Sequence, residues 1–399
     1  MILELTGVAH GGFAVGRHDG KVYFVSGGIP GETVRVEVTR EEKRFSYARV
    51  VEVQQASPDR VPHIWPAVME LGLGGADLGH VSIAGQRRWK ADVITDCLRR
   101  IAKGSVLDEV TNAVGEVSVQ GFSDGTRGTR TRVSFVTDDE CRFAMRKASS
   151  HELVAVTEMP LALQELDRLD LFSGQWSAQL DPGASVKAVL PSDSAPVLVT
   201  PRGVWSAPGE PAPESVRERV LADAGEYCYR VHAGGFWQAH VDAPAVLLDA
   251  VLAGTRLEGT ERVLELYSGA GLLSKVLAER ASHVTAIEGD RTANDDARRN
   301  APSVTQRKAS VTPRVINGRW DAVVLDPPRD GAGLPVARAL AASGARRIVY
   351  VACDPAAMAR DLAELSPAYE IADFQALDLF EHTHHVECVA TLTRRASGR

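Results

Sequence analysis

The chain has 399 residues, of which 44% are hydrophobic and 24% are charged, so wholesale disorder is excluded and two or three domains are expected. Lys and Arg number 45 against 52 Asp and Glu, a net charge of −7, so any contact with nucleic acid must come from a local basic patch. No transmembrane helix or signal peptide is expected, and the five scattered cysteines predict a reducing compartment, the cytoplasm.

Residues 1–56 have the pattern of a small all-β unit. Short β-branched stretches (KVYFVSG, ETVRVEVTR and YARVVEVQQ) are separated by turn signals that contain Gly and Pro. Short strands at such regular spacing predict a compact barrel of the oligonucleotide-binding (OB) type. The pattern alone leaves open whether this barrel binds a nucleic acid or serves only for packing.

Residues 57–235 are expected to hold a connector, one long helix and a central α+β domain. Apolar residues at helical spacing predict an amphipathic helix over 86–103, whose apolar stripe could pack on the C-terminal domain. The basic face of this helix either is solvated or contacts phosphate. In the central domain, Arg130 and Arg132 are expected on one face of a strand, either as plain surface or as contacts to a nucleic-acid backbone.

Residues 236–399 alternate between apolar strands and helical stretches. The strand segments are ERVLELYSG, SHVTAIEGD, WDAVVLDPP, RRIVYVACD and VECVATLTR. This alternation predicts an α/β fold with a mostly parallel, doubly wound sheet of the Rossmann type. Ligands bind at the carboxyl ends of the strands in such a sheet, so polar residues there are candidate site residues.

The first candidate motif is VLELYSGAGLLSKVLAE. A strand ends at Tyr267, and Gly269 and Gly271 open a tight turn into a helix, which lets the backbone approach a ligand closely. Glu288 ends the next strand, where a carboxylate suits the two ribose hydroxyls of an adenosine moiety. Ser274 stands where a dinucleotide site has a third glycine, so the motif favours S-adenosylmethionine over NAD.

Two further strands end in polar groups at the same edge. Asp326 is held by the two prolines that follow it, and Arg329 stands where an amino-methylating enzyme has an aromatic residue. Cys353 ends the following strand, just before a helix whose N-terminus is expected to stabilise its thiolate. A cysteine can also be a small buried apolar residue, but the position of Cys353 beside the donor pocket favours the reactive role.

The last motif, DLFEHTHHVECVATL, places Glu387 at the start of the final strand. There it can act as a general base or pair with a neighbouring charge. Three histidines precede it, at positions 382, 384 and 385. No cluster of Cys or carboxylate residues at ligand spacing accompanies them, so no metal site is predicted.

Together these motifs resemble the uracil-C5 RNA methyltransferase family, which forms 5-methyluridine in tRNA and 23S ribosomal RNA. The resemblance covers nearly the whole chain, and the first segment resembles the RNA-binding TRAM barrel of the ribosomal-RNA members. It implies a class I methyltransferase domain over 236–399, with Cys353 as the nucleophile and Glu387 as the base. GGFWQAH is similar to the family segment F-x-Q-x-N. The donor-pocket residues that the resemblance implies are Gln238, Tyr267, Gly269, Gly271, Glu288 and Asp326.

The sequence departs from the family pattern at several positions. Many members hold an iron–sulfur cluster on four cysteines, but the corresponding residues here are Ala67, Leu73, Ala76 and Met159. Because such a cluster needs four thiolates, none is predicted. The other departures from common family residues are Ser268 for Cys, Ala352 for Ser, His240 for Asn and Glu381 for Pro.

The predicted function is S-adenosylmethionine-dependent methylation of a uridine at C5, through a covalent bond from Cys353 to C6. The expected RNA contacts are Arg329, Arg130 and Arg132. The substrate is expected to be 23S ribosomal RNA, with the T-loop of tRNA as the alternative. Two alternative functions remain open: a methyltransferase for an amine or a small molecule, and a non-catalytic RNA-binding protein with a relic donor pocket. A monomer without a membrane partner is expected.

Overall fold

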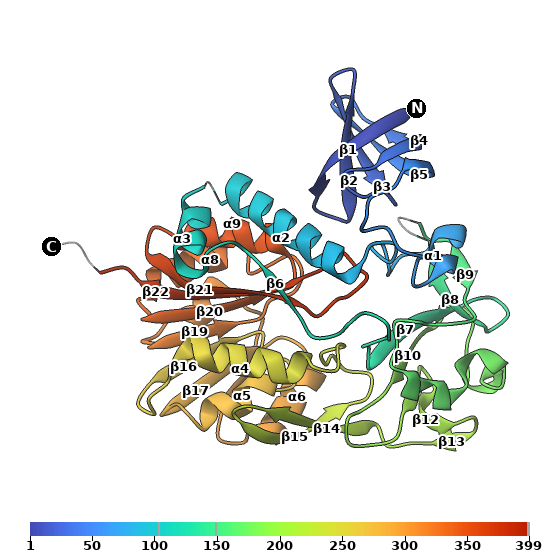
Figure 1. Cartoon of the computed structure of the whole chain (residues 1–399). Helices are drawn as coiled ribbons and strands as arrows, with labels where there is room; N and C mark the ends of the chain where they lie inside the picture. Colours follow the sequence, from blue (N-terminus) through green and yellow to red (C-terminus); the bar gives the residue numbers. More distant parts are fainter. Residues whose placement is uncertain (103, 148–149, 397–399) are drawn as a thin grey trace.

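The computed structural model describes residues 1–102, 104–147 and 150–396, and it contains a barrel, a central domain and a C-terminal domain (Figure 1). The barrel is closed, with strand order β1-β2-β3-β5-β4. Its strands are β1 (Ile2–Ala9), β2 (Phe13–His18), β3 (Lys21–Ser26), β4 (Thr33–Glu41) and β5 (Phe45–Gln55). The predicted OB-like barrel is therefore confirmed.

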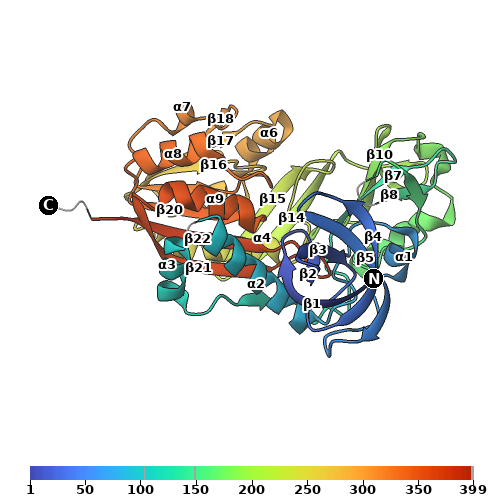
Figure 2. The same cartoon turned by 90° about the horizontal axis from the view of Figure 1, so that it is seen from above.

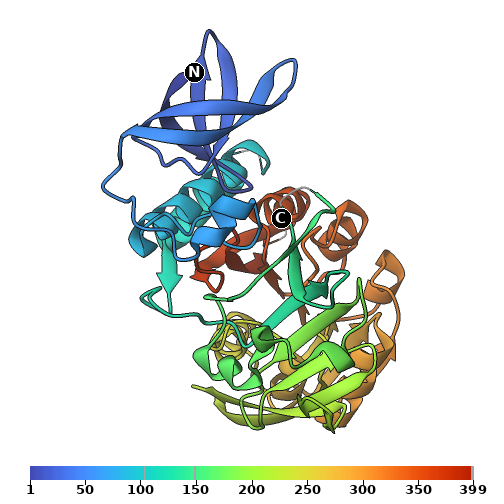
Figure 3. The same cartoon turned by 90° about the vertical axis from the view of Figure 1, so that its right-hand side faces the viewer.

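The interior of the barrel is filled by alternate residues of its strands. Leu3, Val25 and Val34 point inward and are at most 2% exposed, because successive side chains of a strand face opposite sides. Figure 3 shows the barrel at one end of the molecule, next to α2 (Ile83–Arg100). Its β1–β2 loop reaches the C-terminal domain, where His10 Nε2 lies 2.8 Å from Asp354 Oδ2.

The central domain is built on an antiparallel seven-stranded sheet with the order β13-β12-β11-β10-β7-β8-β9. Its strands are β7 (Arg132–Thr137), β8 (Phe143–Arg146), β9 (Leu153–Ala155), β10 (Ser185–Val189), β11 (Val197–Thr200), β12 (Gly203–Ala207) and β13 (Glu210–Pro211). Short helices cover it: α1 (Pro66–Leu71), η1 (Gln164–Leu169), η2 (Leu171–Ser173) and η3 (Ser177–Gln179). Trp65, Phe135 and Trp176 form its apolar core.

The C-terminal domain holds an eight-stranded sheet with the order β18-β17-β16-β19-β20-β22-β21-β6. The strands are β6 (Val119–Gly121), β16 (Arg262–Leu266), β17 (His283–Glu288), β18 (Thr305–Lys308), β19 (Ala322–Leu325), β20 (Arg347–Ala352), β21 (Tyr369–Asp378) and β22 (Glu387–Arg394). β16 to β20 are parallel to one another, and β22 is antiparallel to its two neighbours. The predicted doubly wound α/β sheet is confirmed.

Helices cover both faces of this sheet. Val263 and Val324 pack on one face against α4 and α5, whereas Leu264 and Val323 face α8 and α9 on the other. The helices are α4 (Ala243–Thr255), α5 (Leu272–Ala278), α6 (Arg291–Asn300), α7 (Pro313–Ile316), α8 (Leu334–Ala342) and α9 (Pro355–Leu365). Figure 2 shows the C-terminal and central domains side by side. No helix in the described part of the chain is long and apolar enough to cross a membrane.

Segments from before residue 236 also pack on the C-terminal domain. These are α2, α3 (Ser105–Val114), β6 and the hairpin of β14 (Ser215–Ala222) and β15 (Gly225–His232). The helix that the sequence predicts over 86–103 begins at Ile83 and ends at Arg100 in the structure. Position 103 lies outside the described residues.

The basic face of α2 is not wholly solvated. Lys90 is fully buried and its Nζ lies 2.5 Å from Asp378 Oδ1, while Arg87 pairs with the same carboxylate. These two side chains therefore tie α2 to the C-terminal sheet instead of facing a phosphate.

Candidate active site

A cavity of about 920 Å³ opens at the carboxyl edge of the C-terminal sheet, beyond the ends of β16, β17, β19 and β20. Its volume is typical of ligand sites, and its position is the one expected for an open α/β sheet. The predicted site residues that line it are Gln238, Tyr267, Gly269, Glu288, Asp326, Arg329, Cys353 and Glu387. The structure therefore brings together residues that lie up to about 150 positions apart in the sequence.

The first part of the cavity is formed by the turn after β16. The backbone N–H groups of Gly269 and Asp290 donate hydrogen bonds of 2.8 and 2.7 Å to the two oxygens of Glu288. An ionised carboxylate has about four acceptor positions, so Glu288 can still accept from two ribose hydroxyls. Gly271 has a φ of 89°, and a Cβ there would lie 3.1 Å from Ala297 Cα, so this position needs glycine.

Glu265 is a buried carboxyl group missing from the residues predicted above. It is 2% exposed, lines the cavity, and accepts a hydrogen bond of 2.5 Å from Ser274 Oγ. Burial raises the pKa of Glu265 to about 8, although the bond from Ser274 acts in the opposite direction. The signal that could have revealed it is the acid within the apolar run VLEL.

Glu265→Gln is expected to stabilise the free protein increasingly as the pH rises. Because folding raises the pKa of Glu265, this group's contribution to stability is complete below about pH 4.5 and is lost as the pH rises through about 8. The variant's advantage in unfolding free energy should grow by up to ~4 kcal/mol between pH 5 and pH 8. Denaturant unfolding of both proteins across this range measures it, and a constant difference would contradict a neutral Glu265.

Asp326, Cys353 and Glu387 lie at the ends of three neighbouring strands. Asp326 follows β19, Cys353 follows β20, and Glu387 begins β22. In the antiparallel pair of β20 and β22, Ala352 lies opposite Cys388, so the next position of each strand brings Cys353 towards Glu387. The sheet register therefore places a thiol between two carboxyl groups.

Both carboxyl groups are held in conditions that favour the protonated form. Burial raises the pKa of Asp326 to about 7. Burial first, and then the charge of Asp326, raises the pKa of Glu387 well above its usual value. Glu387 is 4% exposed, and its Oε1 has no hydrogen-bond partner among the described residues. Such a pair is suited to accept and donate protons near neutral pH.

The predicted stabilisation of the Cys353 thiolate is wrong for the free protein. Burial, followed by the charges of Glu387 and Asp326, raises the pKa of Cys353 to about 12, although Arg329 lowers it. The helix N-terminus is also occupied, because Asp354 Oδ1 accepts a hydrogen bond of 2.8 Å from the backbone N–H of residue 357. The raised pKa favours the protonated thiol in the free protein, so attack by this sulfur would require a nearby proton acceptor.

The two central-domain arginines do not share a strand face, which corrects the prediction. Arg132 begins β7, is 8% exposed, and forms an ion pair with Glu218 of β14, so it is not available to RNA. Arg130 precedes the strand and donates a hydrogen bond of 3.2 Å to the carbonyl of Gly75. Arg329, in contrast, is exposed at the rim of the cavity.

Several ring side chains of the cavity wall, among them Phe236 and Phe380, were not identified as site residues from the sequence. Phe236 is 69% exposed, and the rings of Phe380 and His385 lie 5.9 Å apart. Burial, followed by the charges of neighbouring groups, lowers the pKa of His385 to about 3, so its imidazole is neutral. An exposed ring beside a cavity offers a face on which a base can stack. The sequence signal for Phe236 was the aromatic pair in GGFWQ.

Comparison with known proteins agrees with this geometry. Residues 315–395 match the family model described as tRNA (Uracil-5-)-methyltransferase, and residues 2–51 match the TRAM domain. A 23S rRNA (uracil(1939)-C(5))-methyltransferase of Chromohalobacter salexigens is 30% identical, over 98% of this chain and 89% of its own. The chain belongs to the RNA (uracil-5-)-methyltransferase family.

Two other relatives of this uracil-5-methyltransferase cover nearly its full length. An uncharacterized RNA methyltransferase of Streptomyces coelicolor is 36% identical over 99% of the chain and 93% of its own. The crystal structure of Pyrococcus abyssi tRNA (uracil-54, C5)-methyltransferase with S-adenosyl-L-homocysteine has a TM-score of 0.69 at 24% identity, covering 98% of this chain and 100% of that one. This likeness concerns the fold, which is that of an S-adenosylmethionine-dependent methyltransferase.

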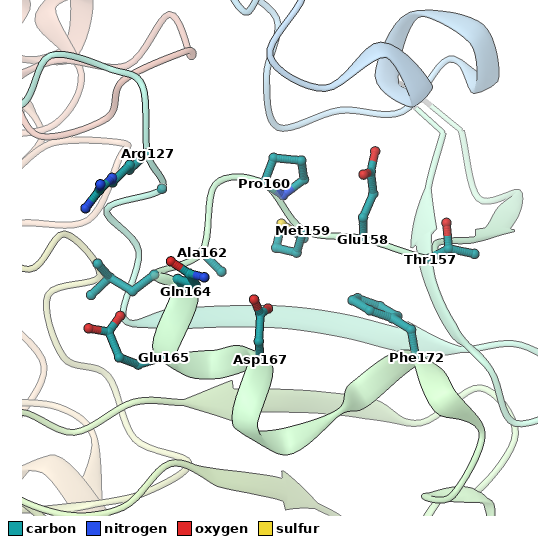
Figure 4. Close-up of a pocket in the computed structure, with 12 residues that line it drawn as sticks. Arg127, Thr157, Glu158, Met159, Pro160, Ala162, Gln164, Glu165, Asp167 and Phe172 are labelled. Atoms are coloured by element: carbon teal, nitrogen blue, oxygen red, sulfur yellow. The ribbon is translucent and has the colours of Figure 1, made fainter.

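An iron–sulfur cluster does not fit the residues at the four positions considered above in this uracil-5-methyltransferase. Leu73 and Ala76 are buried in an apolar cluster with Trp65. Met159 lines a second cavity of about 540 Å³ together with Glu158 and Pro160 (Figure 4). The described residues contain no group of three or more His, Cys, Asp or Glu side chains able to hold a metal. Apolar packing therefore occupies the place of the missing cysteines.

Proposed function

We propose that this uracil-5-methyltransferase methylates a uridine of 23S ribosomal RNA, with Cys353 as the nucleophile and Glu387 as the base. The observation that carries the proposal is the single cavity that holds Cys353, Glu387 and the donor-side Glu288. The TRAM domain and the 30% identity to 23S rRNA methyltransferases support this choice of RNA.

The proposed chemistry starts from the weak nucleophilicity of uracil at C5. As Cys353 Sγ bonds to C6, its proton passes to Asp326, which leaves Glu387 free as a base, and the ring becomes an enolate with raised electron density at C5. S-adenosylmethionine supplies an electrophilic methyl group. Glu387 in its ionised form then takes the C5 proton, and the electron pair of that bond expels the thiolate from C6. Asp326 and Arg329 are suited to hold the edge of the uracil where negative charge develops.

The target uridine must leave its stack to reach this cavity. Arg329 and Phe236 lie at the rim of the cavity, where a cation can contact a phosphate and a ring can stack on a base. We assign these two residues to RNA binding. Arg130 is half-buried and remains only a candidate for this role.

The aromatic face of the TRAM barrel, formed by Phe13, Phe24, Phe45 and Tyr47, is proposed as a second RNA contact. Tyr47 lies at its centre, with ring centroids 5.3 to 5.7 Å from the other three, and Arg40 lies 4.2 Å above its ring. These rings lie on the outer side of the barrel and are half-buried. Stacking on such rings tolerates different bases, so this face suits single-stranded RNA.

Tyr47→Ala is expected to weaken RNA binding. The loss of one stacked base corresponds to ~1–3 kcal/mol, or about 5- to 150-fold in Kd. Fluorescence anisotropy with a labelled single-stranded RNA measures it. Leu221→Ala, which removes an apolar side chain that is 65% exposed on the β14–β15 hairpin, is the matched control and should bind normally. If the wild type, Tyr47→Ala and Leu221→Ala bound the RNA with equal affinity, the aromatic face would not be part of the RNA interface.

Mass-spectrometric mapping of 5-methyluridine in RNA from a deletion strain tests the proposed substrate. Loss of one 5-methyluridine from 23S ribosomal RNA, restored by the wild-type gene, is the expected result. Loss from tRNA instead would identify the T-loop as the target. No loss from either RNA, together with RNA binding but no transfer of labelled methyl, would favour the non-catalytic alternative.

We further propose that the enzyme acts as a monomer in the cytoplasm, with the domain division 1–56, 57–235 and 236–399. All five cysteines are free thiols, which is the state that a reducing compartment favours. The β14–β15 hairpin packs on α4 and α6. Residues 57–235 therefore contribute to the methyltransferase fold as well as to the central domain.

A further inference from the structure

His240 and Glu381 come from distant segments of the chain, and the structure brings them together. They lie 141 positions apart, yet His240 Nε2 is 3.0 Å from Glu381 Oε1. Their side chains are only 1% and 3% exposed.

The hydrogen bonds around this pair define its chemical state. The backbone N–H of Asp242 donates to His240 Nδ1 at 3.0 Å, so the proton of a neutral ring is on Nε2 and is donated to Glu381. The hydroxyls of Ser123 and Thr129 also donate to Glu381, at 2.9 and 3.0 Å. Burial acts to raise the pKa of Glu381, but the bonds from His240 and Ser123 outweigh it and lower that pKa to about 2.

The pair connects two walls of the cavity without lining it. His240 comes two residues after Gln238, and Glu381 directly follows Phe380 and precedes the loop that carries His385. Gln238, Phe380 and His385 line the cavity, whereas neither member of the pair does. The pair can therefore act on the reaction only by holding these wall residues in place.

Replacement of either member alone would be unfavourable. With Pro at position 381, His240 Nε2–H and the hydroxyls of Ser123 and Thr129 would lose a buried acceptor. With Asn at position 240, the buried Glu381 carboxylate would lose the donor that contributes most to its ionised state. The two side chains are thus chemically complementary.

We infer that His240 and Glu381 are one matched pair of positioning residues, which holds the Gln238 wall of the cavity against the wall that carries Phe380 and His385. This inference rests on the proposed function for the meaning of the cavity. Gln238 is proposed to contact the methyl donor, and the loop with His385 leads to Glu387. Loss of the pair should therefore change both methyl-donor binding and turnover.

A double-mutant cycle tests the pair, with His240→Asn, Glu381→Pro and the variant that carries both. Each single substitution is expected to lower kcat for RNA methylation and to raise the KM for S-adenosylmethionine, each by about 10-fold, within the range of coupling between residues in contact. The double variant should recover to within about 3-fold of the wild type. His283→Asn is the matched control, because His283 begins β17 at the opposite edge of the sheet, and both of its constants should be unchanged.

The inference is overturned if the losses of the single variants multiply in the double variant, or if the single variants lose only thermal stability while kcat and KM are unchanged. If Glu381→Pro does not fold, Glu381→Gln completes the same cycle, with an acceptor retained and the charge removed. A wild-type enzyme that methylates no uridine RNA would refute the proposed function instead. The affinity of each variant for S-adenosylmethionine, measured by calorimetry, would then still show whether the double variant recovers methyl-donor binding.

Discussion

Cys353→Ala is expected to abolish both methyl transfer and the covalent complex with RNA. Without the Sγ–C6 bond, C5 of uracil stays too weak a nucleophile to take a methyl group. Removing a nucleophile that acts within a catalytic unit lowers the rate by on the order of 10⁴-fold or more. Transfer of labelled methyl to RNA measures the first effect. A denaturation-resistant complex with RNA that contains 5-fluorouridine measures the second, because fluorine at C5 cannot leave as a proton.

Cys228→Ala is the matched control for this experiment. Cys228 is an exposed cysteine on β15, so its replacement should leave both measurements unchanged. Cys353→Ser distinguishes the proposed chemistry from an alternative, because a methyltransferase for an amine or a small molecule would keep its activity in that variant. A 5-fluorouridine complex that persisted in Cys353→Ala would show that another residue is the nucleophile.

Glu387→Gln is expected to methylate RNA once and to remain bonded to it. A glutamine cannot accept the C5 proton, so the methylated ring keeps its bond to Cys353 and the enzyme is not released. Turnover should fall by about 10²- to 10⁴-fold, while one methyl group per enzyme is still transferred. Gel electrophoresis under denaturing conditions should then show a covalent complex with ordinary uridine RNA, which the wild type does not accumulate.

Glu370→Gln, an exposed position on β21 in the same sheet, is the matched control and should turn over normally. Free methylated RNA released by Glu387→Gln at the wild-type rate would show that another group takes the proton. Asp326 would then be the candidate, because burial raises its pKa to about 7 and it lines the same cavity.

Several features of the site could be predicted because they depend on short stretches of chain. The acid at the end of β17, the turn with Gly269 and Gly271, and the cysteine at the end of β20 follow directly from strands that end in polar residues. The ends of parallel strands meet at one edge, so the prediction that Glu288 and Cys353 share a cavity needed only the order of the elements.

Other features could not be predicted from local pattern. Arg132 was expected at the surface, either without a partner or in contact with a nucleic-acid backbone, but Glu218 of the β14–β15 hairpin pairs with it and it is buried. Lys90 belongs to a helix face that looked basic and solvated, yet it is fully buried against Asp378. In both cases the partner comes from a distant segment, and the sequence around the residue carries no sign of it.

The sequence by itself determined the order and type of the elements, the edge of the sheet at which ligands bind, and the residues that stand there, because these follow from side-chain periodicity and from the residues that end each strand. Only the tertiary structure decided the protonation of Cys353, the pairing of His240 with Glu381 and the burial of Arg132. The physical reason is that burial and nearby charge set these properties, and both come from segments that packing alone brings together.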